Sequence, residues 1–208
     1  MPDKVAETLL NLNAVMLRTK PPFRWVSGIL SPIYTDNRLL MSYPKERDFI
    51  VNSFVKMLKK EKIKFDAFAG TATAGIPWAA WISQKLKKPM IYVRSEAKEH
   101  GKENLVEGKI EEGKVYVVVE DLISTGSSSM NTINAVREKN GVVEDCIAIF
   151  TYELDKAKNN FEAANVKLHT LTTFTNLIKT AIQKKYIEKS ELEHIMDWKK
   201  NPEGWVAI

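Results

Sequence analysis

The sequence predicts an α/β fold in which a central parallel β-sheet is flanked by helices. Apolar runs of strand length alternate with amphipathic stretches of helix length over most of the 208 residues. Parallel strands need a crossover connection, usually a helix, so this alternation favours a parallel sheet that is covered on both faces. The length fits one domain, and we expect residues 1–208 to form it.

The expected strands are short apolar runs bounded by polar or glycine-containing segments. They cover residues 65–69, 90–93, 115–119, 142–150 and 166–171. Between residues 23 and 38, Ser-Gly and Ser-Pro pairs indicate turns that separate shorter extended pieces. Residues 94–113 have no clear period, so we expect a long polar connection there.

The expected helices have apolar residues three or four positions apart. The first begins near the amino terminus and is expected to stop at Thr19, because two prolines follow at positions 21 and 22. The others are expected at residues 44–60, 76–86, 130–139, 156–164, 174–186 and 189–199.

Residues 115–129 carry the strongest functional signal. Five apolar residues predict a buried strand, and Glu120 and Asp121 stand at its carboxyl end, where we expect a solvated acidic pair. Small residues then lead into a helix, an arrangement that favours binding of a phosphate by backbone N–H groups and the helix amino terminus. Two carboxylates can also bind vicinal ribose hydroxyls, so the segment predicts a sugar-phosphate site. An ordinary strand–helix turn with a serine cap is the alternative.

Two known phosphate-binding motifs do not fit this segment. A nucleotide-triphosphate P-loop needs a lysine directly after its second glycine, and none follows Gly126. A dinucleotide-binding fingerprint needs three glycines in the spacing G-x-G-x-x-G, which is missing here.

Two further loops follow expected strands and can contribute to the same site. Residues 70–75, GTATAG, have only small side chains, which allows close approach of an anion to the backbone. Residues 92–108 concentrate cationic and titratable groups, and closure of this segment over a pyrophosphate would exclude water. The alternatives are a plain strand–helix turn and a surface excursion whose charges are solvated.

Composition restricts the classes of protein. The net charge of +5 suits phosphate-rich ligands or RNA, but the lysines cluster near expected helix ends and no aromatic–basic alternation is present, so we expect no nucleic-acid partner. A single cysteine, Cys146, favours a buried thiol in a reducing compartment. Without a signal peptide or an apolar stretch of ~20 residues, we expect a cytoplasmic protein with no membrane partner.

The residues resemble a known family. The acidic pair and the small-residue loop are similar to the PRPP signature of type I phosphoribosyltransferases, where PRPP is phosphoribosyl pyrophosphate. Further segments resemble bacterial orotate phosphoribosyltransferases in particular, namely FRWVSGILSPIYTDNR, GTATAGI, YVRSEAKEHGKENLVEG, VVVEDLISTGSS and IFTYEL.

The resemblance implies a fold, a reaction and an assembly. The fold is the type I phosphoribosyltransferase fold, with a small hood subdomain to which the amino-terminal helix and residues 23–38 contribute. Orotate would attack C1 of PRPP to give orotidine 5′-phosphate and pyrophosphate, a step of pyrimidine (UMP) biosynthesis. Mg²⁺ would be the cofactor, held mainly by PRPP, with Asp121 reaching it through water rather than as a certain direct ligand. The active form would be a homodimer in which residues 92–108, the flap, close over the neighbouring subunit's site.

The resemblance also implies residue roles. In the flap, Arg94, Lys98 and His100 would contact PRPP, and Lys98 and His100 would also act in catalysis. Asp121 is the third implied catalytic residue, and with Glu120 it would hold the ribose hydroxyls. The PRPP loop would comprise Leu122, Ile123, Ser124, Thr125, Gly126, Ser127 and Ser128; the pyrophosphate loop Thr71, Ala72 and Thr73; and the orotate contacts Ser124 and Tyr34.

Three departures from the family pattern leave the partner of the orotate carboxylate open. Ser95 and Val26 stand where some relatives have lysine, and the basic residue nearest to an expected arginine is Lys156. Two other functions stay open from the residues: a phosphoribosyltransferase for another base, and a non-catalytic regulator that senses PRPP.

Overall fold

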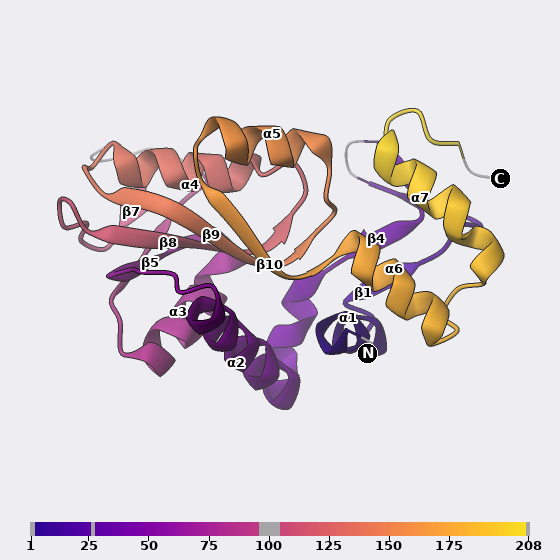
Figure 1. Cartoon of the computed structure of the whole chain (residues 1–208), viewed down its shortest axis with the longest axis horizontal. Coiled ribbons are helices and arrows are strands. Elements are labelled where there is room, and N and C mark those ends of the chain that lie inside the picture. The colour runs from indigo at the N-terminus through magenta and orange to yellow at the C-terminus, as the bar shows by residue number, and fades with distance from the viewer. Residues whose placement is uncertain (1–2, 26–27, 96–104, 207–208) are drawn as a thin grey trace.

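The structure, a computed structural model, describes residues 3–25, 28–95 and 105–206. Its centre is a six-stranded sheet with the strand order β10-β9-β8-β5-β6-β7 (Figure 1). All neighbouring strands are parallel except β6 and β7, which are antiparallel. The predicted α/β class with a central, mainly parallel sheet is therefore confirmed. The strands are β5 Ala67–Thr71, β6 Met90–Val93, β7 Val106–Glu107, β8 Val115–Ile123, β9 Val142–Thr151 and β10 Lys167–Thr173.

Helices cover both faces of this sheet (Figure 1). Helices α2 (Pro44–Lys60) and α3 (Gly75–Leu86) pack on one face, and α4 (Ser127–Arg137) and α5 (Asp155–Ala163) on the other. Alternation along β8 explains the two cores, because Val117 and Val119 pack into one and Val118 packs into the other. All three valines are fully buried, as the run of apolar residues predicted.

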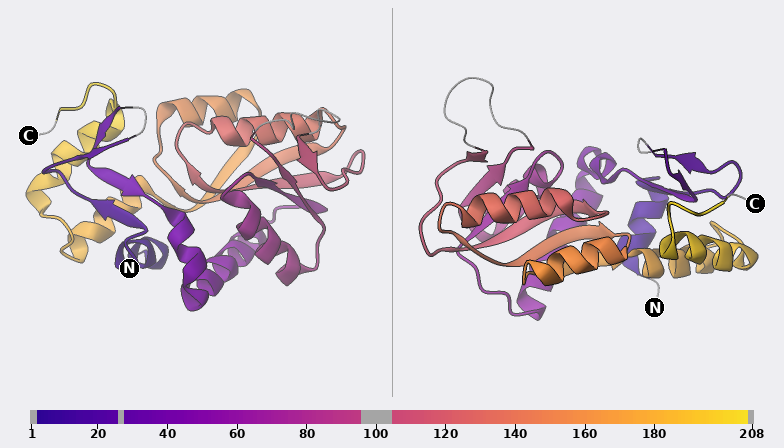
Figure 2. Two further views of the ribbon diagram at one scale, coloured as in Figure 1. Left: turned by 180° about the vertical axis from the view of Figure 1, so that it is seen from behind. Right: turned by 90° about the horizontal axis from the view of Figure 1, so that it is seen from above.

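A second group of elements, the hood, lies at one end of the sheet and combines both ends of the chain (Figures 1 and 2). The indole N–H of Trp198 donates to the carbonyl of Leu30 at 3.0 Å, and the Thr172 hydroxyl donates to the Asp3 carboxylate at 2.7 Å. Its elements are α1 Lys4–Asn11, β1 Val15–Leu17, β2 Phe23–Arg24, β3 Leu30–Ser31, β4 Ile33–Thr35, α6 Phe174–Gln183, η2 Lys189–Glu191 and α7 Leu192–Lys200. The turn η1 (Asn37–Ser42) joins the hood to α2.

The first helix is shorter than predicted. It ends at Asn11, and β1 then pairs with β4 in an antiparallel register that places Val15 opposite Thr35. Leu12 and Met16 therefore lie outside the helix, and their helical spacing from Leu9 is coincidental. Asn13 has a positive φ of 53°, which reverses the chain between the helix and the strand.

Other boundaries shift by one to four residues. Strand β5 begins at Ala67 instead of residue 65, and β8 continues to Ile123 instead of stopping at residue 119. The long connection after β6 contains the short strand β7, whose antiparallel pairing with β6 was not predicted. Among the described residues between 23 and 38, β2, β3 and β4 are short strands, as predicted.

Candidate active site

The acidic pair lies inside strand β8, not after it. Asp121 is 9% exposed and Glu120 is 5% exposed, so the prediction of a solvated pair was wrong. Leu122 packs against one core and Ile123 is buried in the other. The side chains of these two residues therefore hold the end of the strand in place, and only their backbone can face a ligand.

Hydrogen bonds hold the acidic pair rigidly. One oxygen of Glu120 accepts the backbone N–H of Asp121 at 3.1 Å, and the other accepts the Ser128 hydroxyl at 3.1 Å. The side-chain amide of Asn37, from η1, donates to the carbonyl of Asp121 at 2.9 Å. The hood is thus fastened directly to the strand that carries the carboxylates.

Burial changes the acidity of both carboxyl groups. It raises the pKa of Glu120 well above its ordinary value, and the neighbouring charge of Asp121 raises it further. Burial also raises the pKa of Asp121, although hydrogen bonds and the charge of Arg38 offset part of this effect. The two carboxyl groups are therefore harder to ionise together than two exposed ones.

The loop after β8 leads into α4 through a glycine with a left-handed backbone. Gly126 has a positive φ of 79° and directly precedes α4, which begins at Ser127. The first N–H groups of an α-helix have no partner within the helix, so they are free to donate to an anion. The Asn160 side chain donates to the carbonyl of Thr125 at 2.9 Å, and the hydroxyls of Thr125 and Ser127 are 2.9 Å apart. These contacts hold the loop, residues 124–128, in place.

The loop from Thr71 to Ala74 lies beside it, but its flanking glycines serve packing. A Cβ on Gly75 would lie 2.2 Å from the carbonyl oxygen of Val119, so α3 can approach β8 only with glycine at this position. Thr71 is buried, and its hydroxyl accepts from Thr132 of α4 at 3.0 Å. The peptide bond between Ala72 and Thr73 is cis. Within the loop, Ala72 and Ala74 are half-buried and Thr73 is exposed.

Only part of the flap falls within the described residues. The backbone N–H of Arg94 donates to the carbonyl of Leu105 at 2.9 Å, which closes the base of the flap. The guanidinium of Arg94 lies 3.6 Å from the Glu107 carboxylate. Lys98 and His100 lie outside the described residues, so their predicted roles stay predictions.

The predicted orotate contact Tyr34 lies in β4 and is 39% exposed, with its ring 5.8 Å from that of Phe23. Sequence reasoning missed two residues nearby. Asn37 fastens the hood to β8, as described above, and Arg38 forms a two-point ion pair with Asp36 at 2.7 and 2.9 Å. No motif indicated them, because their importance depends on the contact of η1 with β8.

A cavity of about 480 Å³ adjoins the loop after β8, and we call it the base cavity. The loop residues Ser124 and Thr125 contribute to its wall. Its other lining residues come from the hood and from α5, namely Trp25, Ile29, Leu154, Asp155, Lys156, Lys199, Lys200, Asn201, Pro202 and Glu203. Trp25 is thus part of this wall.

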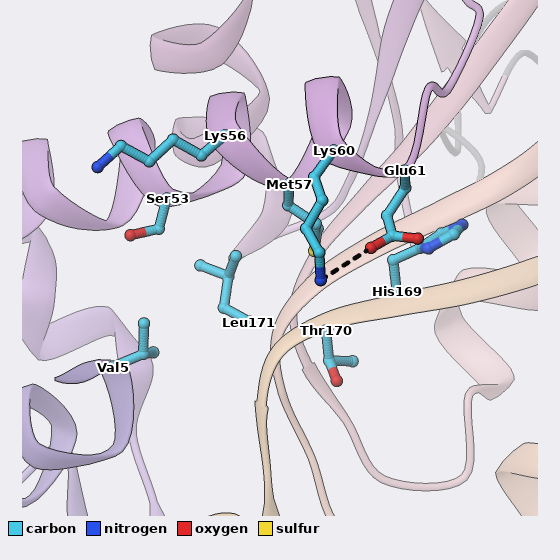
Figure 3. Close-up of a pocket in the computed structure, with 9 residues that line it drawn as sticks. All are labelled: Val5, Ser53, Lys56, Met57, Lys60, Glu61, His169, Thr170 and Leu171. Carbon is cyan, nitrogen blue, oxygen red and sulfur yellow. Dashed lines mark ion pairs between the residues drawn. The ribbon is translucent and has the colours of Figure 1, made fainter. Parts of the chain in front are cut away.

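A second cavity, of about 600 Å³, lies between α2, β10 and α1 (Figure 3). Lys60 pairs with Glu61 in its wall at 3.4 Å, and His169 also lines it. A ring nitrogen of His169 lies 2.7 Å from an Asp145 carboxylate oxygen, a contact between β10 and β9. This cavity shares no residue with the loop after β8, so it does not belong to the predicted site.

Comparison with known proteins identifies the family. A model of the phosphoribosyl transferase domain matches residues 45–156. The orotate phosphoribosyltransferase of Coxiella burnetii is 50% identical over 202 residues, which cover 97% of each chain. The chain belongs to the orotate phosphoribosyltransferase family. The resemblance seen in the sequence is thereby confirmed, and with it the type I phosphoribosyltransferase fold.

Solved structures of the family agree with this assignment. The orotate phosphoribosyltransferase of Aeropyrum pernix is 28% identical and aligns with a TM-score of 0.75, covering 84% of this chain and 96% of its own. UMP synthase of Leishmania donovani aligns with a TM-score of 0.79 at 26% identity and covers 94% of this chain. The chain spans only 41% of the length of that larger protein.

The described residues contain neither a membrane-spanning helix nor a cluster of metal-binding side chains. No helix within residues 3–25, 28–95 and 105–206 is long and apolar enough to span a membrane. Over the same ranges, no three His, Cys, Asp or Glu side chains are grouped as a metal site. The acidic pair therefore offers two carboxylates at most.

Proposed function

We propose that this chain transfers the phosphoribosyl group of PRPP to orotate, giving orotidine 5′-phosphate and pyrophosphate, at the carboxyl end of β8. The observation that carries the proposal is the juxtaposition of two buried carboxylates, Glu120 and Asp121, with a helix-starting loop in a member of the orotate phosphoribosyltransferase family. Glu120 and Asp121 bind the ribose hydroxyls of PRPP, and residues 124–128 bind its 5′-phosphate.

The reaction needs charge stabilisation more than proton transfer. A ring nitrogen of orotate forms a bond to C1 of the ribose while the bond from C1 to pyrophosphate breaks, so positive charge develops on the ring and negative charge on the leaving group. Carboxylates beside the ribose favour the first charge, and cations beside the pyrophosphate favour the second. Asp121 serves the ribose side, and Arg94 and Lys98 of the flap serve the pyrophosphate side.

Mg²⁺ fits this site only as an ion bound jointly with PRPP. Glu120 and Asp121 match the way Mg²⁺ binds to one or two carboxylates together with substrate phosphates. Asp121 would hold the ion through water, and the bound ion would neutralise charge on the departing pyrophosphate. The raised pKa of Glu120 fits a site that becomes fully charged only when this cationic partner arrives.

The proposal includes a homodimer with shared sites. The flap, including Lys98 and His100, closes over the site of the partner subunit, and His100 donates a hydrogen bond or a proton to the leaving pyrophosphate. The position of the base of the flap supports this proposal. The bond between Arg94 and Leu105 follows β6, next to β7 at the edge of the sheet.

We place the enzyme in the cytoplasm, with small-molecule substrates and no nucleic-acid or membrane partner. Cys146 is a free, fully buried thiol, and a cysteine without a disulfide supports a reducing compartment. Burial also raises the pKa of this thiol, which leaves it unreactive.

Loss of orotate absorbance on addition of PRPP and Mg²⁺ to the purified protein tests the proposal directly. We expect turnover with orotate and little turnover with uracil, hypoxanthine or adenine. Turnover of another base instead of orotate would assign the chain to a different phosphoribosyltransferase. Tight PRPP binding with no turnover of any base would make it a PRPP-sensing regulator.

A further inference from the structure

The base cavity is built from parts of the chain that are far apart in sequence. Ser124 and Thr125 connect it to the proposed PRPP site, and Trp25 and Ile29 of the hood form an apolar wall. Three lysines and two carboxylates, Asp155 and Glu203, also line it. The cavity therefore places cationic groups beside an apolar wall, which suits an anionic planar ligand with one apolar face.

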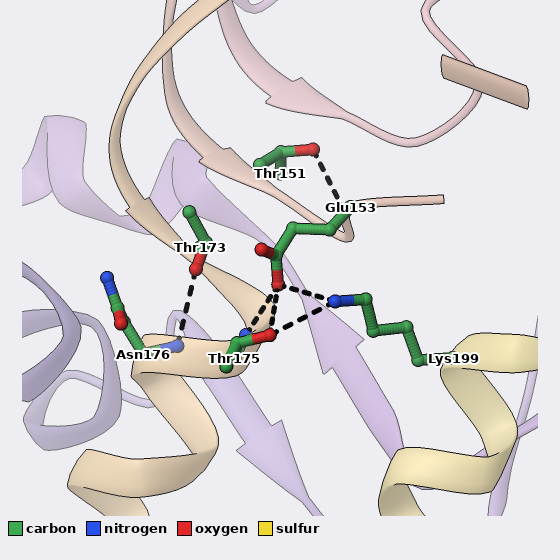
Figure 4. Close-up of polar contacts among 6 residues, drawn as sticks. All are labelled: Thr151, Glu153, Thr173, Thr175, Asn176 and Lys199. Carbon is green, nitrogen blue, oxygen red and sulfur yellow. Dashed lines mark hydrogen bonds and ion pairs between the residues drawn. The ribbon is translucent and has the colours of Figure 1, made fainter. Parts of the chain in front are cut away.

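One of these lysines is held in a fixed position. The ammonium of Lys199 donates to the Glu153 carboxylate at 3.0 Å and to the Thr175 hydroxyl at 3.0 Å (Figure 4). The same Glu153 oxygen accepts the backbone N–H of Thr175 at 2.8 Å and its hydroxyl at 2.5 Å. This network joins Glu153, two residues after β9, to the start of α6 and the end of α7, so the ammonium has one preferred location.

The backbone of Lys199 is also anchored. Its neighbour Trp198 is fully buried, donates to the Leu30 carbonyl, and stacks edge-on against Trp25 with ring centres 5.4 Å apart. The helix end that carries Lys199 is therefore fixed to the same hood residues that form the apolar wall of the base cavity.

We propose that Lys199 is the specificity-determining residue that binds the carboxylate of the base, with its third N–H directed into the base cavity. The proposal rests on the proposed function, since orotate differs from uracil by this carboxylate. An ammonium has three donors, and Glu153 and Thr175 occupy two of them. A pre-positioned cation recognises a carboxylate at little entropic cost.

The other two lysines of the cavity are less suited to this role. Lys200 is 74% exposed and pairs with Asp197 on its own helix at 2.8 Å. Lys156 is exposed at the start of α5. A long exposed side chain loses more rotamer freedom on binding, so neither offers a fixed ammonium.

The test compares steady-state kinetics of the full-length wild type, Lys199→Gln and Lys199→Arg. Removing a charged hydrogen bond to the base should raise the KM for orotate by about 10- to 100-fold, while the KM for PRPP changes less than about 3-fold. The preference for orotate over uracil should fall by the same factor as the orotate kcat/KM. Lys199→Arg should retain most of the preference, because it keeps the charge.

Two controls separate recognition of the base from a structural effect. Lys184→Met removes another hood lysine, which pairs with Glu7 away from the cavity, and should leave both KM values unchanged. The double variant Glu153→Gln/Lys199→Gln removes both partners and should keep the loss of orotate preference. Thermal unfolding of each variant checks that the fold is intact.

Suppose that the wild type turns over orotate and that the orotate KM of Lys199→Gln stays within about 3-fold of the wild-type value. The role of Lys199 would then be overturned, while the proposed function would stand. Restored preference in the double variant would also overturn the role of Lys199, because the single variant would then act through an unpaired Glu153. A wild type that rejects orotate would instead refute the proposed function.

Discussion

Replacing Gly126 with alanine tests the conformation of the phosphate loop. A φ of 79° costs a residue with a side chain about 1 to 2 kcal/mol. The new Cβ would lie 3.0 Å from Cε2 of Phe161, and displacing that buried ring adds about 1 kcal/mol. We therefore expect Gly126→Ala to lower the free energy of unfolding by about 2 to 3 kcal/mol, which corresponds to a Tm lower by about 4 to 12 °C.

Gly113 provides a matched control for this experiment. It is exposed and has a similar φ of 73°, but a Cβ at this position would meet no heavy atom within 4 Å. Gly113→Ala should cost only the backbone term, about 1 to 2 kcal/mol, and should not change the kinetics.

Urea unfolding and steady-state kinetics measure both consequences. We expect Gly126→Ala to raise the KM for PRPP by about 10- to 100-fold, because a small displacement of the loop misplaces its N–H groups, with a smaller effect on orotate. Gly126→Val should be more severe. Equal stability losses at Gly126 and Gly113 would refute the contact with Phe161, and equal changes of the two KM values would refute the assignment of the loop.

Three other perturbations address the acidic pair, the packing below it and the dimer. Burial raises the pKa of Glu120 above its ordinary value of 4.5, so folding takes up a proton and the stability of the wild type falls as pH rises above that value. The gain in Tm from Glu120→Gln, measured without ligands, should therefore grow from pH 5 to pH 8. A gain that stays constant over this range would contradict the pKa shift. Gly75→Ala places a Cβ 2.2 Å from the Val119 carbonyl oxygen and should lower the free energy of unfolding by about 3 kcal/mol. A denaturant titration measures this loss, and an unchanged unfolding midpoint would argue against this packing. Mixing inactive Lys98→Ala and Asp121→Asn chains should restore about a quarter of wild-type activity, since about half of the dimers are mixed and each mixed dimer has one intact site. Mass spectrometry verifies that the subunits have exchanged. If activity then does not recover, Lys98 acts in its own subunit.

Local patterns in the sequence predicted most of the sheet and its helices. From Tyr116 to Val119 the predicted strand is buried on both faces, as its unbroken apolar character indicated, and Val115 at its start is half-buried. The positive φ and close packing of Gly126 likewise agree with a glycine required at a helix start. These features depend on neighbouring residues, so local chemistry is sufficient to predict them.

Features that depend on distant contacts were missed. Glu120 and Asp121 look like residues that follow a strand, yet they continue β8, because pairing with β9 extends to Ile123 and Thr151. The early end of α1 depends on the pairing of Val15 with Thr35. No local pattern links Glu153 with Lys199, 46 residues later, so the network beside the base cavity was not predicted.

The joining of both chain ends in the hood has a consequence for the order of folding. The bond from Trp198 to Leu30 closes a separation of 168 residues, and the bond from Tyr186 to Asn11 closes one of 175. Contacts of such high sequence separation form late, because the entropy of the intervening chain must be lost first. During synthesis, β8 and the loop after it can be complete while α7 is still absent. The chain therefore completes the loop proposed to bind phosphate before the wall proposed to distinguish one base from another.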